Sequence, residues 1–165
     1  MSLYRLTQQS SIIRTSDNTV IPNDPANSDY QQYQLWLSQG NVPDPVPLSD
    51  LANNQIQIIK NSYNQAISNN VTYTNSVGTF EYQTDVNSRN NILSTITGFS
   101  LANTVPPNFY WRSANNVNVP FTLTELQELA QAMLSQGWTA FEKRTTLIDQ
   151  ILSANTANTI TSVVW

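Results

Sequence analysis

The 165-residue chain contains no cysteine and no histidine. The lack of cysteine excludes a disulfide framework and thiol chemistry. The lack of histidine excludes Ser-His-Asp and Cys-His catalysis and removes the commonest protein ligand of transition metals. A glycine-rich phosphate-binding loop is also absent. We therefore expect a protein that is not an enzyme, with no catalytic residues, no cofactor and no metal site.

Carboxylates are the remaining groups that could do acid–base chemistry, and a pair of them could hydrolyse a glycosidic bond. Asp85 and Glu125, however, each stand at the start of a predicted helix, where a carboxylate satisfies backbone N–H groups. Asp24 and Asp29 fit turn or cap positions. The acidic residues therefore indicate capping and not catalysis.

Charge is scarce in this chain, with 11% charged residues and a net charge of −4. The largest cationic cluster is Lys143-Arg144, whereas nucleic-acid binding needs several cations on one face. No apolar run is long enough to cross a bilayer, and no signal peptide opens the chain. We expect neither a nucleic-acid nor a membrane partner, and folding in a cytoplasm.

The strongest local signals predict a long helix that begins after Thr122. Thr122 and Glu125 form a capping box, and Phe121 and Leu126 can form a hydrophobic staple across it. Apolar or small residues then recur at three- and four-residue spacing: Leu126, Ala130, Met133, Gly137, Ala140, Leu147 and Ile151. This period indicates one buried helix face. Leu134, Phe141 and Ile148 lie beside it.

Two residues stand out within that stripe. Gly137 in a helix interior predicts the close approach of another backbone, or else a kink. Arg144 interrupts the apolar pattern. It predicts a rim residue whose stem is buried and whose charge reaches solvent, with a buried ion pair at an interface as the alternative.

Two β-hairpins are predicted ahead of this helix, each leading into a helix. In the first, residues 71–74 and 79–82 alternate on either side of a turn. In the second, residues 108–113 and 117–120 flank Ala114-Asn115-Asn116. The local plan is therefore strand, strand, helix, twice over.

The helix between the hairpins is predicted to start at Thr84 or Asp85, either of which can serve as N-cap. Its apolar side is expected to consist of Val86, Leu93 and Ile96. Gly98 is expected to follow its C-terminus, because glycine readily adopts the left-handed conformation that ends helices.

This order of elements resembles a small domain that is common in bacteriophage tail-fibre assembly proteins. The run from Val71 to Ile92 matches its first half, with a hairpin, the capping Asp85 and a Ser88-Arg89 pair on the helix. The run from Trp111 to Ala130 matches its second half, with a tryptophan-containing strand, an Asn-rich turn, a Val-Pro pair and a capped helix. The resemblance spans residues 71–152.

The N-terminal part predicts a separate small module. Residues 2–7 form a strand or a loose arm, and residues 11–21 form a hairpin. A short helix follows, with Tyr30, Tyr33, Trp36 and Leu37 on one side. This stripe indicates core packing, with a binding face as the alternative. The stretch from Ile13 to Pro43 also resembles a motif of small phage proteins encoded near tail-fibre genes.

Proline at alternate positions from Pro43 to Pro47 favours an extended linker. The predicted organisation is an N-terminal module (1–42), a linker (43–48), an α+β domain (49–152) and a C-terminal tail (153–165). The domain opens with a helix over 49–68, capped by Ser49. Its narrow apolar stripe predicts one partner helix, either the long helix or one from a second chain.

The C-terminal tail predicts a strand, because residues 159–165 are rich in β-branched side chains and end in tryptophan. Such a strand pairs within its own domain or adds to a strand of another chain. The candidate partner-binding residues are therefore Ile160, Val163 and Trp165, with Tyr110 and Trp111 of the second hairpin behind them.

The resemblance implies an α+β protein that binds a phage tail fibre, at its C-terminal region, and assists its folding or trimerisation in the host cytoplasm. One alternative is a permanent adaptor or cap of the fibre or baseplate in the virion tail. Another is a glycan-binding receptor module. A homo-oligomer, or several copies on a trimeric fibre, would suit the first two functions.

Overall fold

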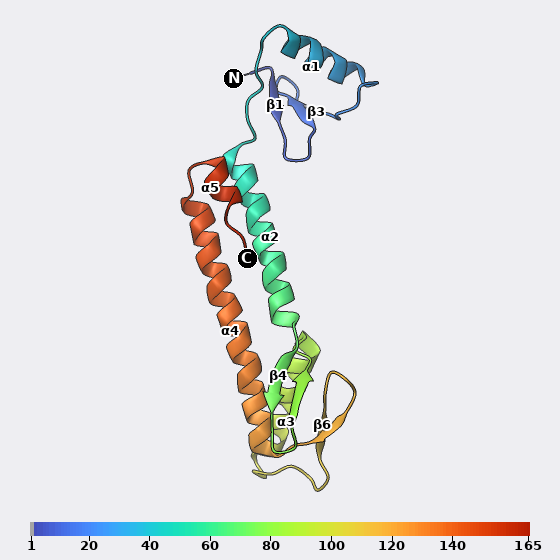
Figure 1. Cartoon of the computed structure of the whole chain (residues 1–165), viewed down its shortest axis with the longest axis vertical. Coiled ribbons are helices and arrows are strands. Elements are labelled where there is room, and N and C mark those ends of the chain that lie inside the picture. The colour runs from blue at the N-terminus through green and yellow to red at the C-terminus, as the bar shows by residue number, and fades with distance from the viewer. Residues whose placement is uncertain (1) are drawn as a thin grey trace. The chain divides into compact units, whose positions relative to one another are not determined.

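Three small antiparallel sheets and five helices form the part of the chain that the structure describes, and they confirm the predicted α+β class (Figure 1). The structure is a computed structural model that describes residues 2–165. In chain order the elements are β1 (Tyr4–Leu6), β2 (Ile12–Arg14), β3 (Thr19–Ile21), α1 (Ser28–Ser38), α2 (Leu48–Ser68), β4 (Val71–Thr74), β5 (Thr79–Tyr82), α3 (Val86–Ser100), β6 (Tyr110–Arg112), β7 (Asn118–Pro120), α4 (Leu123–Ser153) and α5 (Ala157–Thr161).

The chain divides into two compact units. The N-terminal residues up to Gln57 together with Gln150–Val164 form unit 1, and Ile58–Asp149 together with Trp165 form unit 2. This division falls within helices α2 and α4. The proline-rich linker at 43–48 does not separate the units, and its role as a domain boundary stays a prediction.

Unit 1 contains the β1-β2-β3 sheet and α1, which share a small aromatic core. The residues buried in it are Tyr4, Ile12, Ile21 and Tyr33. The Tyr4 ring meets the rings of Tyr33 and Trp36 edge-on, each with centroids 5.0 Å apart. Asn27 caps α1 by accepting a hydrogen bond from the backbone N–H of Tyr30. The predicted core role of this aromatic stripe is therefore confirmed for Tyr33.

The first residues of the linker are paired with β1. The backbone N–H of Leu6 donates to the carbonyl of Asp44 at 2.9 Å, and the N–H of Asp44 donates to the carbonyl of Tyr4 at 2.9 Å. The Asp44 carboxylate also accepts from the backbone N–H of Ser2 at 3.0 Å. Asp44 is therefore fixed by the sheet edge, although prolines flank it on both sides.

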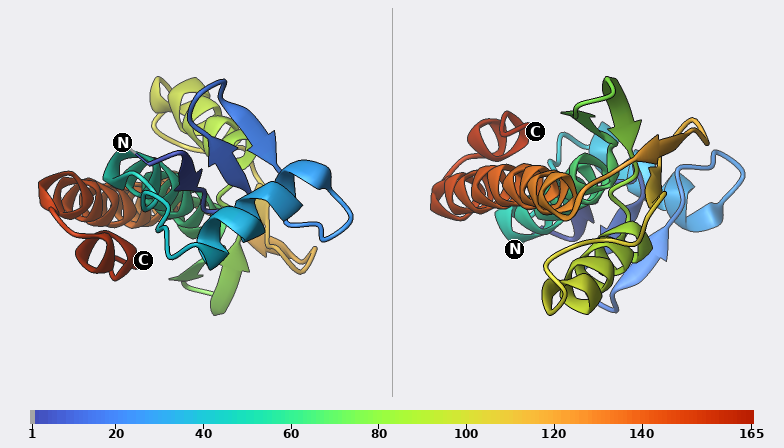
Figure 2. Two further views of the ribbon diagram at one scale, coloured as in Figure 1. Left: turned by 90° about the horizontal axis from the view of Figure 1, so that it is seen from above. Right: turned by 90° about the horizontal axis from the view of Figure 1, so that it is seen from below.

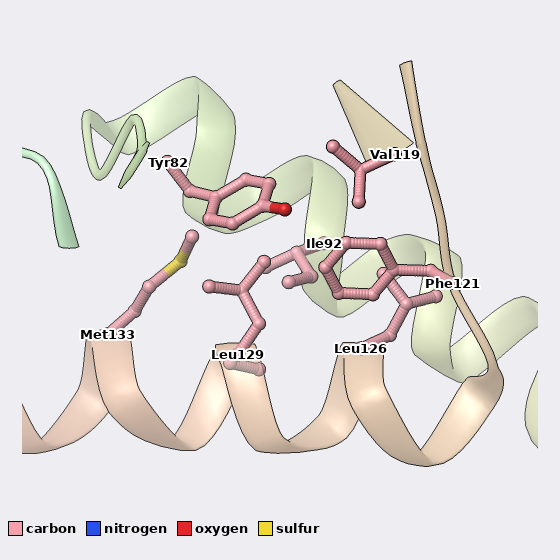
Figure 3. Close-up of a cluster of buried hydrophobic side chains, with 8 residues drawn as sticks. Tyr82, Ile92, Val119, Phe121, Leu126, Leu129 and Met133 are labelled. Atoms are coloured by element: carbon pink, nitrogen blue, oxygen red, sulfur yellow. The ribbon is translucent and has the colours of Figure 1, made fainter. Parts of the chain in front are cut away.

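Unit 2 is built around one hydrophobic cluster, which helix α4 shares with α3 and the two hairpins. Figure 3 shows Leu126, Leu129 and Met133 pointing from α4 toward Ile92 of α3. Tyr82, Val119 and Phe121 close the cluster from the hairpins. Burial raises the pKa of Tyr82 to about 12, so its hydroxyl stays protonated at neutral pH.

The predicted start of the long helix is confirmed. The Thr122 hydroxyl accepts from the backbone N–H of Glu125 at 3.2 Å, and the Glu125 carboxylate accepts from the N–H of Thr122 at 2.7 Å. The same carboxylate also accepts from the backbone N–H and the hydroxyl of Ser76, at 3.1 and 2.8 Å. Glu125 thus joins the β4–β5 turn to the first turn of α4.

Both predicted hairpins of unit 2 are confirmed, although the strands of the second are shorter than predicted. Val71 faces Tyr82 and Thr74 faces Thr79 in the first, and Tyr110 faces Pro120 in the second. The tight turn of the second hairpin is possible because Asn116 adopts a left-handed conformation, with φ of 63°.

Helix α3 departs from its prediction in two respects, its C-terminal end and its buried side. Asp85 is its N-cap, but α3 continues through Gly98 to Ser100, so the predicted C-terminal role of Gly98 is wrong. Val86 and Leu93 are exposed, and the buried residue is Ile92. The predicted helix is present, but the side that it turns toward the core contains Ile92 and not Val86 and Leu93. Helix α2 begins one residue earlier than predicted, so Ser49 lies in its first turn.

The predicted strand at the C-terminus is wrong, because residues 157–161 form the short helix α5. Thr156 and Thr159 form a reciprocal capping box at its start. Figures 1 and 2 show α5 turning back beside the end of α4, and Ile160 is 1% exposed there. Capping and the burial of one isoleucine thus outweigh the β preference of the threonine and valine side chains.

Candidate functional site: an apolar groove on helices α3 and α4

Unit 2 contains an open groove on the surface of α3 and α4, with Tyr63 of α2 in its lining. It has a volume of about 730 Å³ and an apolar lining. The residues that shape it are Arg89, Leu93, Leu134, Gly137, Trp138 and Phe141. We call it the α3–α4 groove. It lies over the hydrophobic cluster, since the buried Ile92 and Met133 form part of its wall.

Large apolar side chains of the groove remain in contact with solvent. Leu134 is 56% exposed, Trp138 60% and Leu93 45%. Single exposed apolar residues are normal, but a contiguous group of this kind marks interaction sites on soluble proteins. The α3–α4 groove is therefore the leading candidate for a binding surface in unit 2.

Helix α4 exposes these residues because it has two apolar stripes. The first includes Leu126, Met133 and Ala140, which are buried as predicted. The second is displaced around the helix and consists of Leu134, Trp138, Phe141, Thr145 and Ile148, at alternating four- and three-residue steps. One neighbouring layer of structure covers the first stripe, so Leu134, Trp138, Phe141 and Thr145 of the second remain exposed, and Ile148 is half-buried.

Two aromatic rings of the second stripe are held together. Trp138 and Phe141 stack with centroids 5.5 Å apart and an interplanar angle of 22°. The guanidinium of Arg144 lies 5.0 Å from the Phe141 ring centroid and 4.4 Å from that of Tyr63. Cation–π contacts of this geometry stabilise the arrangement of the rings. The exposed aromatic surface is therefore ordered by its own contacts.

The surroundings of Arg144 distinguish between its two predicted roles, a rim residue and a buried ion pair. Its guanidinium is sandwiched by aromatic rings. Within residues 2–165, the ion pairs involve only Arg14 with Asp17 and Asp29, so Arg144 has no carboxylate at ion-pair distance. Arg144 is half-buried, in agreement with a rim residue, while the alternative of a buried ion pair is not found within the described chain.

Gly137 and Arg89 form the wall of the groove near the end of α2. A Cβ built on Gly137 would lie 3.9 Å from Nη1 of Arg89, and no backbone atom comes within 4 Å of it. The predicted close approach of another backbone is therefore wrong. The helix continues through Gly137 without interruption.

Arg89 is oriented by the C-terminal end of α2. Its Nη2 donates to the carbonyl of Ile67. The hydroxyl of Thr84 donates to the carbonyls of Ile67 and Asn69, at 3.0 and 2.6 Å, and the Gln136 amide donates to the carbonyl of Asn69 at 2.9 Å. These bonds satisfy carbonyl groups that a helix end leaves unpaired. They also fix α2, α3 and α4 around one end of the groove.

The candidate partner-binding residues from the sequence are not gathered in one place. Ile160 is part of the buried core of unit 1, which excludes it as a contact residue in this fold. The carbonyl of Val163 accepts from the Gln55 amide at 2.6 Å. The predicted strand, whether paired within its own domain or with another chain, is replaced by α5 and the turn that follows it. The β preference of the tail was visible in the sequence, but the burial of Ile160 was not.

The three aromatic candidates all belong to unit 2. Tyr110 is 52% exposed, and Trp111 packs against the hydrophobic cluster. Trp165 lies under the ammonium group of Lys143, 4.8 Å from the ring centroid. Lys143 is 17 residues beyond Leu126 on α4, which corresponds to about 25 Å of helix. Trp165 and Trp111 therefore cannot form one contact patch.

Sequence reasoning missed Leu93 and Trp138 as surface residues. A signal was present, because Leu134, Phe141 and Ile148 were recognised beside the main stripe. Their spacing defines a second heptad pattern that includes Trp138. An apolar surface wider than one stripe indicates either a deeply buried helix or a second partner.

Unit 1 contains a smaller hollow of about 340 Å³ between the sheet and α1. Its lining combines the Tyr30 ring with hydrogen-bonding groups of Asn23, Gln34 and Thr7. Within residues 2–165, no group of three or more acidic residues is placed to hold a metal ion. No helix in the same range is long and apolar enough to span a bilayer.

Comparison with known proteins places the chain in a family. Neither a search of curated proteins nor a search of solved structures found a match. Residues 50–163, from the first turn of α2 to just beyond α5, match the family model described as "Domain of unknown function (DUF4376)". The match covers more than half of the chain, so the protein belongs to the DUF4376 family.

Proposed function

We propose that this protein is an assembly factor for a bacteriophage tail fibre. It binds the fibre, at the fibre's C-terminal region, and assists its folding or trimerisation in the host cytoplasm. The sequence resemblance over residues 71–152 supports the phage setting. The observation that carries the proposal is the α3–α4 groove, whose leucine and tryptophan side chains are left in solvent by the folded chain.

The groove suits a protein that protects another one during folding. A fibre rich in β-structure folds slowly and exposes apolar surface and unpaired strand edges while it does so. Covering apolar surface releases about 25 cal/mol per Å². The exposed rings of Trp138 and Phe141 provide such a cover without any chemical step, and aromatic residues are the usual anchors of interfaces.

The scaffold around the groove is suited to this task because hydrogen bonds connect its elements. Glu125 ties the β4–β5 turn to the start of α4, and Thr84 ties α3 to the end of α2. The binding surface is therefore ordered before the partner arrives, which lowers the entropic cost of association.

Co-expression with the neighbouring fibre gene tests this proposal. The fibre alone is expected to be largely insoluble, and the fibre with this chain soluble. Leu134→Asp should abolish the gain in soluble fibre, because it places a charge in the groove. Leu35→Asp is the matched control, since Leu35 is 62% exposed on α1, in unit 1, against 56% for Leu134.

Two outcomes would count against an assembly factor. Equal amounts of soluble fibre with and without the chain would contradict assistance in folding. One copy of the chain per fibre subunit in purified particles, measured by mass spectrometry, would favour a permanent adaptor or cap in the virion tail instead.

A second candidate function, glycan binding, is favoured by the hollow of unit 1. An aromatic ring beside amide and hydroxyl groups, here Tyr30 with Asn23, Gln34 and Thr7, is the combination that binds a sugar ring. A glycan array probed with the isolated chain separates the two candidates. Specific binding that Tyr30→Ala abolishes would support the receptor module.

A further inference from the structure

The second stripe of α4 has the spacing of a coiled-coil seam. Its steps alternate between four and three residues, as in a heptad repeat with apolar a and d positions. In that repeat the d positions are Leu134, Phe141 and Ile148, and the a positions are Trp138 and Thr145. The seam therefore matches another helix laid along α4 better than a strand or an irregular loop.

The charges beside this seam indicate which helix that is. Arg144 is at a g position and Asp149 at the following e position, five residues on. In a parallel pair, the g residue of one helix meets this e residue of the other. The cation–π contact with Phe141 holds the Arg144 guanidinium beside the seam, and the Asp149 side chain is exposed. A copy of α4 thus supplies the carboxylate that Arg144 lacks in its own chain.

An antiparallel pair of α4 helices lacks this complementarity. Antiparallel helices place e positions opposite e positions, and those of α4 are Ser135, Glu142 and Asp149. No cation is available among them. Glu142 and Asp149 would then add repulsion to the flank of the seam.

We propose that a second copy of this chain covers the seam, with the two α4 helices parallel and in register. The contact buries Trp138 and Phe141 of both copies and forms two Arg144–Asp149 ion pairs. It uses the face that we assign to the fibre. If the proposed function holds, dimerisation and fibre binding exclude each other, and that consequence alone rests on the proposed function.

Cysteine cross-linking tests the parallel arrangement, and the absence of native cysteine makes it clean. Residues at an a position face their own copies only in a parallel pair, so Thr145→Cys should form a covalent dimer under mild oxidation. Thr146→Cys is the matched control. It is the next residue, it is equally a threonine with an exposed side chain, and it points about 100° away from the seam. It should remain monomeric.

Light scattering of the unmodified chain provides the second measurement. At about 100 μM, where a dimer with a micromolar Kd is largely formed, the expected mass is twice the 18.5 kDa of one chain. Trp138→Asp should restore the single mass with an unchanged circular dichroism spectrum. Asp149→Lys should weaken the dimer about tenfold, because both exposed ion pairs are lost and each Arg144 then meets a like charge.

Two results would overturn the proposal. A mass of one chain for the unmodified protein, together with no cross-link through Thr145→Cys, would show that the seam does not pair with itself. A dimer that cross-links no better through Thr145→Cys than through Thr146→Cys would place the contact elsewhere or make it antiparallel. Neither result would affect the fibre co-expression experiment, so the two proposals can fail separately.

Discussion

Trp138 and Phe141 stack on one face of α4, 5.5 Å apart, with the indole 60% exposed and the phenyl ring 39% exposed. Ala140, which precedes Phe141, is buried, and so is Met133, which precedes the exposed Leu134. The same helix thus supports the fold with one stripe and exposes the other, which we propose as a binding surface. Substitutions in the buried stripe should therefore lower stability, whereas substitutions in the exposed stripe should mainly weaken binding.

Trp138→Ala is expected to lower the free energy of unfolding by only about 0.5–1.5 kcal/mol, since the mostly exposed ring loses its stack on Phe141 and little else. Leu129→Ala, at a position that is 0% exposed, should cost about 2–5 kcal/mol. Urea denaturation followed by circular dichroism measures both. A loss of several kcal/mol in Trp138→Ala would contradict its assignment to the binding surface.

Thr84→Val should destabilise unit 2 by about 0.5–1.5 kcal/mol, because the carbonyls of Ile67 and Asn69 each lose one of their two donors. Thr84 is 0% exposed, and its hydroxyl bonds to the carbonyls of Ile67 and Asn69. Valine keeps the shape of threonine, so packing changes little. Thr84→Ser is the control, because it retains the hydroxyl. If the valine variant were the more stable of the two, the capping role would be wrong.

Glu125 should make stability depend on pH. Burial raises the pKa of Glu125, but the hydrogen bonds from Thr122 and Ser76 outweigh it, and the pKa lies below its ordinary value. The ionised carboxylate therefore stabilises the fold above the ordinary glutamate pKa, and this stabilisation disappears as pH falls through the lowered pKa.

Glu125→Gln isolates that charge. At pH 7 it should lower the free energy of unfolding by about 1 kcal/mol, and the difference from the unmodified chain should shrink below about pH 4. Denaturation curves recorded from about pH 3 to about pH 7, a range that spans the ordinary glutamate pKa, give the free-energy difference at neutral and at acidic pH. A difference that grew on acidification would contradict this sign.

Gly137→Ala should stabilise the protein by about 1 kcal/mol, because alanine favours the helix and its methyl group would make an ordinary contact with Arg89. The thermal midpoint of unfolding checks this directly. A lowered midpoint would show that the guanidinium of Arg89 cannot tolerate the added carbon.

The sequence was informative where local chemistry determines the structure. The start of α4 follows from the capping box of Thr122 and Glu125, and the second hairpin follows from its Asn-rich turn. Both depend on residues within a few positions of one another. The buried stripe of α4 could be predicted as well, since its period is a property of the helix alone.

What depends on distant residues could not be predicted. Gly98 has the residue type of a helix end, but α3 continues past it to Ser100. The tail has the composition of a strand, but Ile160 is buried on a short helix. The binding surface was missed for a related reason, because the side of α4 that its own fold leaves uncovered is decided by α3 and the hairpins.

The central claim is that the α3–α4 groove binds the fibre, and the affinity of the purified chain for the purified fibre tests it most directly. Titration calorimetry should compare the unmodified chain with Leu134→Asp and with the control Leu35→Asp. We predict that Leu134→Asp weakens binding at least about tenfold, or about 1.4 kcal/mol, while Leu35→Asp changes it less than about twofold. Equal binding by all three proteins would contradict the claim.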